Sequence, residues 1–341
     1  MSDQSKIVDT PSLRAAFPSE SFFSGSVEVK QLAGDASSRC YYRLTSARER
    51  MSLVLQVADS FPAEDAARHP FLCAQQLLHA VGVPVPRVLA TDGVRGWVLL
   101  EDLGDETLQN RGVGPALYKK SLDIMTRWHR EVRLDSPLIP AELKAAAPHF
   151  GWAFDEAKLG FEMGFTAEHY FEKMLGMPQD RFLPLMQKTV GFLSAQPRYF
   201  CHRDFHSRNV MVKGSKLFII DFQDARMGPL AYDLVSLLWD PYVRSSEEDR
   251  SELLKAWKTG LGKMTVPANF EEELERMKIQ RLLKAVGSYA SFFNRKGNSS
   301  YLPHVKPALH DAREAIRNLI NMKLAFTEEI ELLTLLSAIQ H

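Results

Sequence analysis

The stretch from residue 200 to residue 229 restricts the possible folds of this chain more than any other part of its sequence. Its loop 202–209 carries Asp204 and Asn209, and Asp221 follows a predicted hairpin over residues 209–220. Because a hairpin doubles the chain back on itself, it can return Asp221 to the end that holds Asp204 and Asn209. The fold must therefore allow two carboxylates and one amide to meet.

Phosphoryl transfer from a nucleotide needs such a set of side chains. One carboxylate must lie near the acceptor hydroxyl, an amide or carboxylate must hold a magnesium ion, and a second carboxylate must bind magnesium on the phosphate side. Asp204, Asn209 and Asp221 fit these three roles. His202, Asp204 and His206 also alternate, as metal ligands on one face of a strand would. That alternative does not explain why Asn209 and Asp221 are present.

The sequence before residue 104 predicts a different structure from the sequence after it. Period-two alternation and turn residues predict strands at 27–32, 41–44, 52–57, 87–91 and 96–100, with one helix over 65–79. Later apolar residues recur at three- and four-residue spacing, which predicts helices at 114–135, 166–195, 231–239, 246–259, 270–293, 305–325 and 327–340. The stretch 295–300 is predicted to be an exposed loop. We expect an α+β chain with a β-rich lobe over 1–103 and a larger helical lobe over 104–341.

The composition limits the partners of the chain. Lys plus Arg number 42 and Asp plus Glu number 42, so the net charge is +0, which argues against a nucleic-acid binder. Cys40, Cys73 and Cys201 form no CxxC pair, so a reducing compartment fits best. No signal peptide pattern is present, and no apolar run approaches the ~20 residues of a membrane span. We expect a cytoplasmic protein without a membrane partner, and the sequence carries no signature of an oligomeric state.

The loop and the segment after the hairpin resemble two kinase motifs. In protein kinases a catalytic loop H-R-D-x-x-x-x-N precedes a D-F-G segment, and here the loop 202–209 precedes Asp221-Phe222-Gln223. His206 and the continuation over 224–234 resemble the aminoglycoside phosphotransferase family, which includes aminoglycoside, choline and sugar kinases. The resemblance implies a two-lobed protein-kinase-like fold and ATP-dependent phosphorylation of a small-molecule hydroxyl.

Four further segments look like one branch of that family, the bacterial kinases of the anomeric hydroxyl of N-acetylmuramate and N-acetylglucosamine in cell-wall recycling. These segments are 34–43, 99–104, 221–225 and 232–238. This resemblance implies a sugar acceptor. Two alternatives stay open: a kinase for another hydroxyl acceptor, such as an aminoglycoside or an amino alcohol, and a non-catalytic nucleotide-binding pseudokinase.

The resemblance also implies the roles of single residues. Asp204 would orient the acceptor hydroxyl and take up its proton, and Asn209 and Asp221 would bind Mg²⁺. ATP would lie under a turn that covers its phosphates and against a hinge that faces adenine. The residues expected to bind the nucleotide are Gly34, Ser37 and Ser38 in the turn, Arg43, and Glu101, Asp102 and Leu103 in the hinge.

On the acceptor side the implied contacts are His206, Asp224, Trp239 and Asp240. Each has a plainer alternative: His206 as a structural ring, Asp224 as a turn cap, and the other two as core residues. His202 is expected to bind loop backbone with its ring. Asp233 is expected to anchor a loop or begin a helix rather than to act in catalysis.

One position departs from the kinase pattern. The third strand of a kinase usually carries a Lys that pairs with the α- and β-phosphates, but here it reads Val54-Leu55-Gln56-Val57. Another cation, Arg39 or Arg43, would then serve the phosphates. The missing Lys is also what motivates the pseudokinase alternative.

Overall fold

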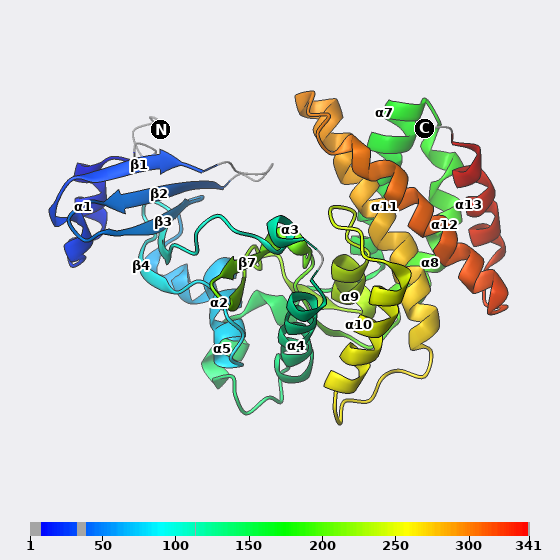
Figure 1. The fold of residues 1–341 in the computed structure, drawn as a ribbon, viewed down its shortest axis with the longest axis horizontal. Coiled ribbons are helices and arrows are strands. Elements are labelled where there is room, and N and C mark those ends of the chain that lie inside the picture. The colour runs from blue at the N-terminus through cyan, green and yellow to red at the C-terminus, as the bar shows by residue number, and fades with distance from the viewer. Residues whose placement is uncertain (1–7, 33–38, 113, 340–341) are drawn as a thin grey trace.

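The computed structural model describes residues 8–32, 39–112 and 114–339, and it joins a β-sheet region to a helical region (Figure 1). Five strands form one antiparallel sheet in the order β1-β2-β3-β5-β4. Their bounds are Val27–Gln31 (β1), Cys40–Ser46 (β2), Met51–Val57 (β3), Val88–Asp92 (β4) and Trp97–Glu101 (β5). All five overlap the strands that period-two alternation predicts.

The two faces of this sheet have different partners, because successive side chains of a strand point to opposite faces. Leu53 and Leu55 of β3 pack with Trp97 and with Leu13 of helix α1 (Thr10–Ala16) in one hydrophobic cluster. Val54, between them, belongs to the other face and packs with helix α2 (Pro70–Ala80) and the helical region. The second face therefore lines the space between the two regions.

The helical region is organised around one long helix, α11 (Phe270–Lys296), which packs against α6, α8, α9 and α12 (Figure 1). The other helices are α3 (Leu108–Arg111), α4 (Pro115–Glu131), α5 (Ala141–Ala146), α6 (Glu156–Thr166), α7 (Lys173–Leu175), α8 (Leu183–Ser194), α9 (Ala231–Leu238), α10 (Glu247–Gly260), α12 (Val305–Asn321) and α13 (Thr327–Ala338). Gly287 permits the close approach of α6 to α11, since a Cβ there would lie 2.7 Å from Thr166 Cα.

The loop 202–209 connects two short antiparallel strand pairs, because it joins β6 (Tyr199–Cys201) of one pair to β7 (Val210–Lys213) of the other. Strand β6 pairs with β9 (Arg226–Gly228), and β7 pairs with β8 (Lys216–Ile219). The predicted hairpin is thus confirmed, and its second strand returns the chain to Asp221.

The predicted helix over 166–195 is wrong. The structure has α6, a π-helical turn over Ala167–Glu172, α7, and then α8. Gly176 adopts φ +65°, the left-handed conformation that ends helices, and Pro178 cannot donate a helical hydrogen bond. The helix also begins ten residues earlier than predicted, where the Asp155 side chain caps it by accepting from Lys158 N.

Two other boundaries differ from the prediction. Helix α11 extends to Lys296, into the stretch predicted to be a loop, and ends at Gly297 with φ +64°. The helix predicted over 65–79 begins only at Pro70, because a 3₁₀ helix, Ala63–Arg68, precedes it. Proline favours the first turn of a helix, where its missing N–H costs nothing.

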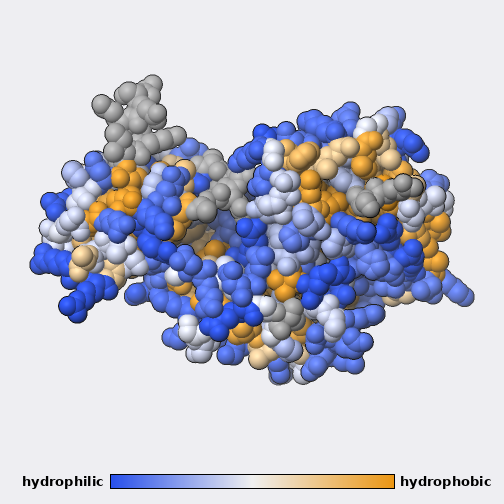
Figure 2. Space-filling model, turned by 45° about the horizontal axis from the view of Figure 1, so that its top comes forward, coloured by the Kyte–Doolittle hydropathy of each residue, from blue (hydrophilic) through white to orange (hydrophobic). Residues whose placement is uncertain are grey.

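The chain passes from the sheet to the helical region between Glu101, the end of β5, and Leu108, the start of α3. The predicted division at residue 103 falls in this connection and stays a prediction. Figure 2 shows the surface hollowed between the two regions. Within the described ranges, no helix combines the length and the apolar character that a membrane crossing requires.

Candidate functional site

The loop 202–209 is fixed by hydrogen bonds to its backbone. His202 N and Arg203 N donate to the two carboxylate oxygens of Asp233, at 2.6 and 3.1 Å. The His202 ring lies 2.9 Å from Ile220 O, at the end of the hairpin. The prediction that Asp233 anchors a loop is therefore confirmed, and the ring of His202 contacts backbone of the hairpin instead of the loop. Burial raises the pKa of Asp233 to about 7, although its two backbone donors act in the opposite direction.

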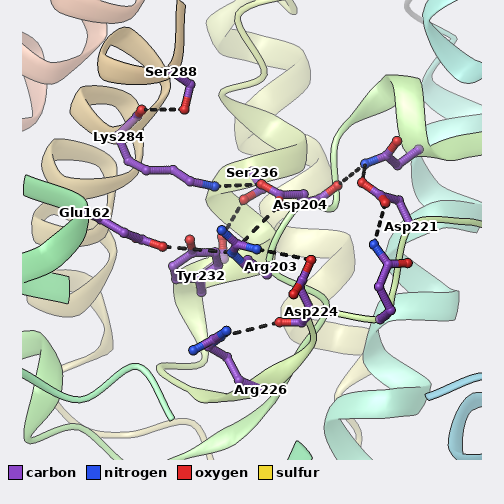
Figure 3. A network of polar contacts seen from close by, with 12 residues as sticks. Glu162, Arg203, Asp204, Asp221, Asp224, Arg226, Tyr232, Ser236, Lys284 and Ser288 are labelled. Atoms are coloured by element: carbon purple, nitrogen blue, oxygen red, sulfur yellow. Dashed lines mark hydrogen bonds and ion pairs between the residues drawn. The ribbon is translucent and has the colours of Figure 1, made fainter. Parts of the chain in front are cut away.

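Asp204 projects from this loop toward helix α11 (Figure 3). Its Oδ1 accepts hydrogen bonds from Lys284 Nζ at 2.7 Å and from Arg281 Nη2 at 3.3 Å. Burial favours the neutral acid, but the charges of Lys284, Arg203 and Arg281 outweigh it and hold the pKa of Asp204 well below its usual range. The carboxylate is therefore ionised and is held in place by cations of another element.

Asn209 and Asp221 lie beside Asp204, as the hairpin argument predicts. Asn209 Nδ2 donates to Asp204 O at 2.9 Å and lies 3.4 Å from Asp221 Oδ2. Gln223 Nε2 donates to Asp221 Oδ1 at 2.7 Å. Burial raises the pKa of Asp221 to about 6, partly offset by the Gln223 hydrogen bond and reinforced by the charge of Asp204.

Two residues of this centre have left-handed backbone. Arg203 has φ +84° and Asp221 has φ +65°, and they are two of the four non-glycine residues with positive φ in the described ranges. Such conformations persist only where the surroundings impose them, and they cluster at functional sites. At Arg203 the backbone N–H is held by the Asp233 carboxylate.

These residues fit a hard divalent cation that is coordinated partly by protein oxygens and partly by phosphate oxygens. The Asn209 amide nitrogen is engaged by Asp204 O, which leaves the amide oxygen, and the Asp221 carboxylate supplies further oxygens. Mg²⁺ prefers oxygen ligands and is usually held by one or two carboxylates together with phosphates. In the part of the chain that the structure describes, no group of three or more His, Cys, Asp or Glu side chains could hold a metal ion alone.

A cavity of about 290 Å³ lies between the sheet and this centre. Its walls come from β2, β3, the connection after β5, and the hairpin; they include Tyr41, Arg43, Val54, Phe71, Leu100, Glu101, Asp102, Leu103, Gly104, Asn209, Met211 and Asp221. The three predicted hinge residues thus line one cavity with Asn209 and Asp221. Gly34, Ser37 and Ser38 lie outside the described residues.

Arg43 lies in this cavity, but its guanidinium is bound to the hinge. Arg43 Nε lies 2.7 Å from Asp102 Oδ2, and Arg43 Nη1 lies 2.8 Å from Asp105 Oδ2. Ser52 Oγ and Gly104 N also donate to the Asp102 carboxylate. These bonds join β2 and β3 to the hinge, and a phosphate contact of Arg43 stays a prediction.

A second cavity, of about 230 Å³, lies on the other side of Asp204. Its lining includes Arg203, Asp204, His206, Ser236, Trp239, Asp240, Tyr242, Arg281, Lys284, Ser288, Tyr289, Phe292 and Tyr301. His206, Trp239 and Asp240 line this cavity together with Asp204, and a contact of each with the acceptor stays a prediction. Burial lowers the pKa of His206 to about 3, so its ring is neutral.

Asp240 and Asp224 differ from the expectation in what their carboxylates contact. Asp240 Oδ2 accepts from Ser207 N at 2.8 Å and Ser207 Oγ at 2.5 Å, so this carboxylate holds the loop. Asp224 does not line the second cavity; its Oδ2 lies 3.5 Å from Arg203 Nη1. Neither geometry tests a substrate contact, which stays a prediction for both.

Residues 28–267 match the phosphotransferase enzyme family (APH), which is more than half of the 341-residue chain. The chain belongs to this family. It is 32% identical over 292 residues to the N-acetylmuramate/N-acetylglucosamine kinase of Pseudomonas aeruginosa, which covers 82% of this chain and 80% of that protein. It is 30% identical over 331 residues to the protein of the same name from Neisseria meningitidis, which covers 94% of this chain and 93% of that one.

Solved structures of phosphotransferases confirm the predicted two-lobed, protein-kinase-like fold. A spectinomycin phosphotransferase, solved with ADP and spectinomycin, superposes with a TM-score of 0.61 at 13% identity over 91% of this chain and 94% of that one. A choline/ethanolamine kinase family protein from Mesorhizobium loti superposes with a TM-score of 0.55 at 14% identity over 96% and 98%.

Sequence reasoning missed two cations of this phosphotransferase, Arg281 and Lys284. Both lie on α11, more than seventy positions beyond Asp204, and both reach its carboxylate. The available signal was two basic residues three positions apart within the apolar stretch Leu282, Leu283, Ala285 and Val286. Charged side chains in such surroundings are rarely buried without a partner.

Proposed function

We propose that this phosphotransferase is an ATP-dependent kinase that phosphorylates the anomeric hydroxyl of an amino sugar of the N-acetylmuramate/N-acetylglucosamine type. The observation that carries the proposal is the placement of Asp204, Asn209 and Asp221 between two cavities. The curated relatives with these substrates in their names span most of the chain, which supports the choice of acceptor.

ATP would occupy the cavity between the sheet and Asp221. Its adenine would face the backbone of Glu101 to Leu103, and its phosphates would extend toward Asn209 and Asp221. The lobe over 1–103 would then bind the nucleotide, and the lobe over 104–341 would supply the catalytic loop and the acceptor site. The spectinomycin phosphotransferase, whose structure contains ADP, supports nucleotide use by this fold.

The acceptor hydroxyl would lie beside the carboxylate of Asp204. Its oxygen attacks the γ-phosphorus, the bond from that phosphorus to the oxygen bridging the β-phosphate breaks, and ADP leaves. The hydroxyl proton passes to Asp204. Because the transition state of phosphoryl transfer is loose, the carboxylate acts mainly by orienting the hydroxyl until late in the reaction. Its low pKa agrees with that role.

Asn209 and Asp221 would hold Mg²⁺ through their oxygens. When bound, the ion supplies positive charge to the phosphate oxygens. Gln223 keeps one Asp221 oxygen in position through its 2.7 Å hydrogen bond. Asp204 O fixes the Asn209 amide in the same way.

The test is ADP release from ATP and Mg²⁺ with N-acetylglucosamine, N-acetylmuramate, kanamycin or choline as acceptor. We expect turnover with the amino sugars, and a decrease of about 10²–10⁴-fold in Asp204→Ala, the usual contribution of a general base. Turnover with kanamycin or choline alone would replace the proposed acceptor. Bound ATP without turnover on any of the four would favour a non-catalytic nucleotide-binding protein.

A further inference from the structure

The cavity beside Asp204 carries more positive than negative charge in its lining. Arg203, Arg281 and Lys284 contribute cations, whereas the carboxylates are those of Asp204 and Asp240. Asp240 accepts three hydrogen bonds from Ser207 and Tyr242, so its charge is directed into the loop and away from a ligand. The guanidinium of Arg203 also faces Glu162 and Asp224. The positive charge that an acceptor meets next to the reacting hydroxyl therefore comes from Arg281 and Lys284.

Lys284 is the cation best placed to meet an acceptor. Its side chain is 12% exposed, and it reaches Asp204 Oδ1 across the cavity at 2.7 Å (Figure 3). An ammonium carries three donors, and within the described ranges Asp204 accepts the only hydrogen bond from Lys284 Nζ. Burial, together with the charge of Arg281, lowers the pKa of Lys284 to about 8. The charged ammonium is therefore destabilised in this site, and a second anion beside it would stabilise it.

Arg281 reinforces this charge from one turn earlier on α11. Its Nε donates to Ser236 Oγ at 2.8 Å and its Nη2 lies 3.3 Å from Asp204 Oδ1. Residues three apart on a helix share a face, so Arg281 and Lys284 both face the cavity. The Ser236 bond fixes the guanidinium, and the longer Lys284 side chain stays adjustable.

Aromatic side chains also line the cavity, one of them, Tyr289, on α11 itself. The rings of Tyr289 and Tyr301 stack with centroids 5.7 Å apart and an interplanar angle of 8°, and Tyr242 meets Tyr289 edge-on. Flat apolar faces of this kind suit the C–H face of a sugar ring. The cavity thus combines a cationic end at Asp204 with a wall for an uncharged ring.

Building on the proposed function, we propose that Lys284, supported by Arg281, binds an anionic group of the acceptor and thereby makes the site favour an acidic amino sugar over its neutral counterpart. N-acetylmuramate and N-acetylglucosamine form such a pair, since the first carries a carboxylate on a lactyl ether that the second lacks. The same charges disfavour cationic acceptors, because like charges in a confined site repel.

The test compares the two sugars in Lys284→Met, which keeps the length of the side chain and removes its charge. We expect kcat/KM for N-acetylmuramate to fall at least tenfold more than kcat/KM for N-acetylglucosamine. Lys284→Arg should keep the ratio of the two close to that of the unmodified enzyme. Lys296→Met, the same change at an exposed position of the same helix, is the control.

An equal fall for both sugars would overturn the inference, because Lys284 would then act only through Asp204. If the variant turns over too slowly, the dissociation constants of both sugars, measured by calorimetry with the same protein, give the same ratio. An unmodified enzyme that turns over neither sugar would contradict the proposed function and the inference with it. Activity on both sugars with an unchanged ratio in Lys284→Met contradicts the inference alone.

Discussion

The two cavities beside the loop 202–209 are built from different kinds of structure. The cavity proposed for the nucleotide is formed by strands, a hinge and a hairpin, and its main cation, Arg43, is bound to hinge carboxylates. The cavity proposed for the acceptor is formed largely by side chains of α11 and the aromatic residues packed against it. Several strands and loops contribute to the first cavity, whereas one helix, α11, contributes much of the second.

Because of this difference, we expect the nucleotide cavity to govern ATP binding and the acceptor cavity to govern which sugar is phosphorylated. A cavity formed by strand register and a hinge changes little when single side chains change. A cavity whose charge depends on Lys284 and Arg281 changes with one substitution. Variants on the two sides of Asp204 should therefore differ in which kinetic constant they alter.

Among the variants that compare the two cavities, the largest effect is expected at Asp221, which lines the nucleotide cavity together with Asn209. Asp221→Asn removes a carboxylate charge from the predicted magnesium site, and Asn tolerates the left-handed backbone at φ +65°. We expect kcat to fall by about 10²–10³-fold with both sugars, the usual loss when one stabilising group of a transition state is removed. Steady-state kinetics over a magnesium titration measure it, and an unchanged magnesium dependence would exclude this role.

An intermediate effect is expected at Arg39, on the nucleotide side alone. Tyr41 and Arg43 line that cavity, and period-two alternation continues their face to Arg39. Burial raises the pKa of Asp221 and the charge of Arg39 partly opposes it, and burial followed by the charge of Arg39 lowers the pKa of His69. Arg39 therefore lies near the predicted phosphate site. Arg39→Met should raise KM for ATP about tenfold, the value of one charge-assisted hydrogen bond, and leave the ratio of the two sugars unchanged.

A rescue experiment sharpens the prediction for Arg39. Gln56 is fully buried on the same face of β3 as Val54, and it pairs with Tyr41 in the strand where kinases carry Lys. Both polar atoms of its amide are without a partner in the described structure. Gln56→Lys in the Arg39→Met background should recover part of the ATP affinity. Unchanged ATP kinetics in the single variant would place the phosphates elsewhere.

The smallest effect is expected at Glu273, which lies in neither cavity. Its Oε1 accepts from Ala231 N at 2.8 Å, and burial raises its pKa from 4.5 to about 7. A carboxyl with a raised pKa stabilises the fold below its unfolded pKa, and this stability is lost as the pH rises through about 7.

Glu273→Gln abolishes this titration and keeps the acceptor for Ala231 N. Between pH 5 and pH 8 the free energy of unfolding of the variant, relative to the unmodified chain, should therefore rise by about 1–3 kcal/mol. Urea unfolding at the two pH values measures it. Equal pH dependence of the two proteins would show that Glu273 titrates normally, and the ratio of the two sugars should not change in any case.

The sequence predicts those parts of the site that depend on short-range pattern. Period-two alternation predicts the strands that contain Val54 and Tyr41. The loop 202–209 and the hairpin after it predict that Asp204 and Asp221 lie close together. These features need only neighbouring residues and one turn. They could be predicted because the reactive side chains and the turn that brings them together lie in the same segment, residues 200–229.

The parts that could not be predicted depend on contacts between distant segments. Lys284 reaches Asp204 because α11 packs beside α9, and no local pattern states that packing. The prediction of one helix over 166–195 was wrong for a local reason. The apolar spacing continues through Gly176, although the chain leaves the helix there. The phosphate contact of Arg43 stays a prediction, and its bonds to Asp102 could not be predicted because they depend on the register of the sheet.

The close contact between Gly287 and Thr166 has a consequence for redesign of the enzyme. A larger residue at position 287 would meet Thr166 at the closest approach of α6 and α11, so the present spacing of the two helices requires glycine there. Arg281, Lys284 and Ser288 lie within two turns of that contact. A library varied at these three positions would explore new acceptors on an unmoved scaffold, whereas variation at Gly287 would mostly yield chains that fold poorly.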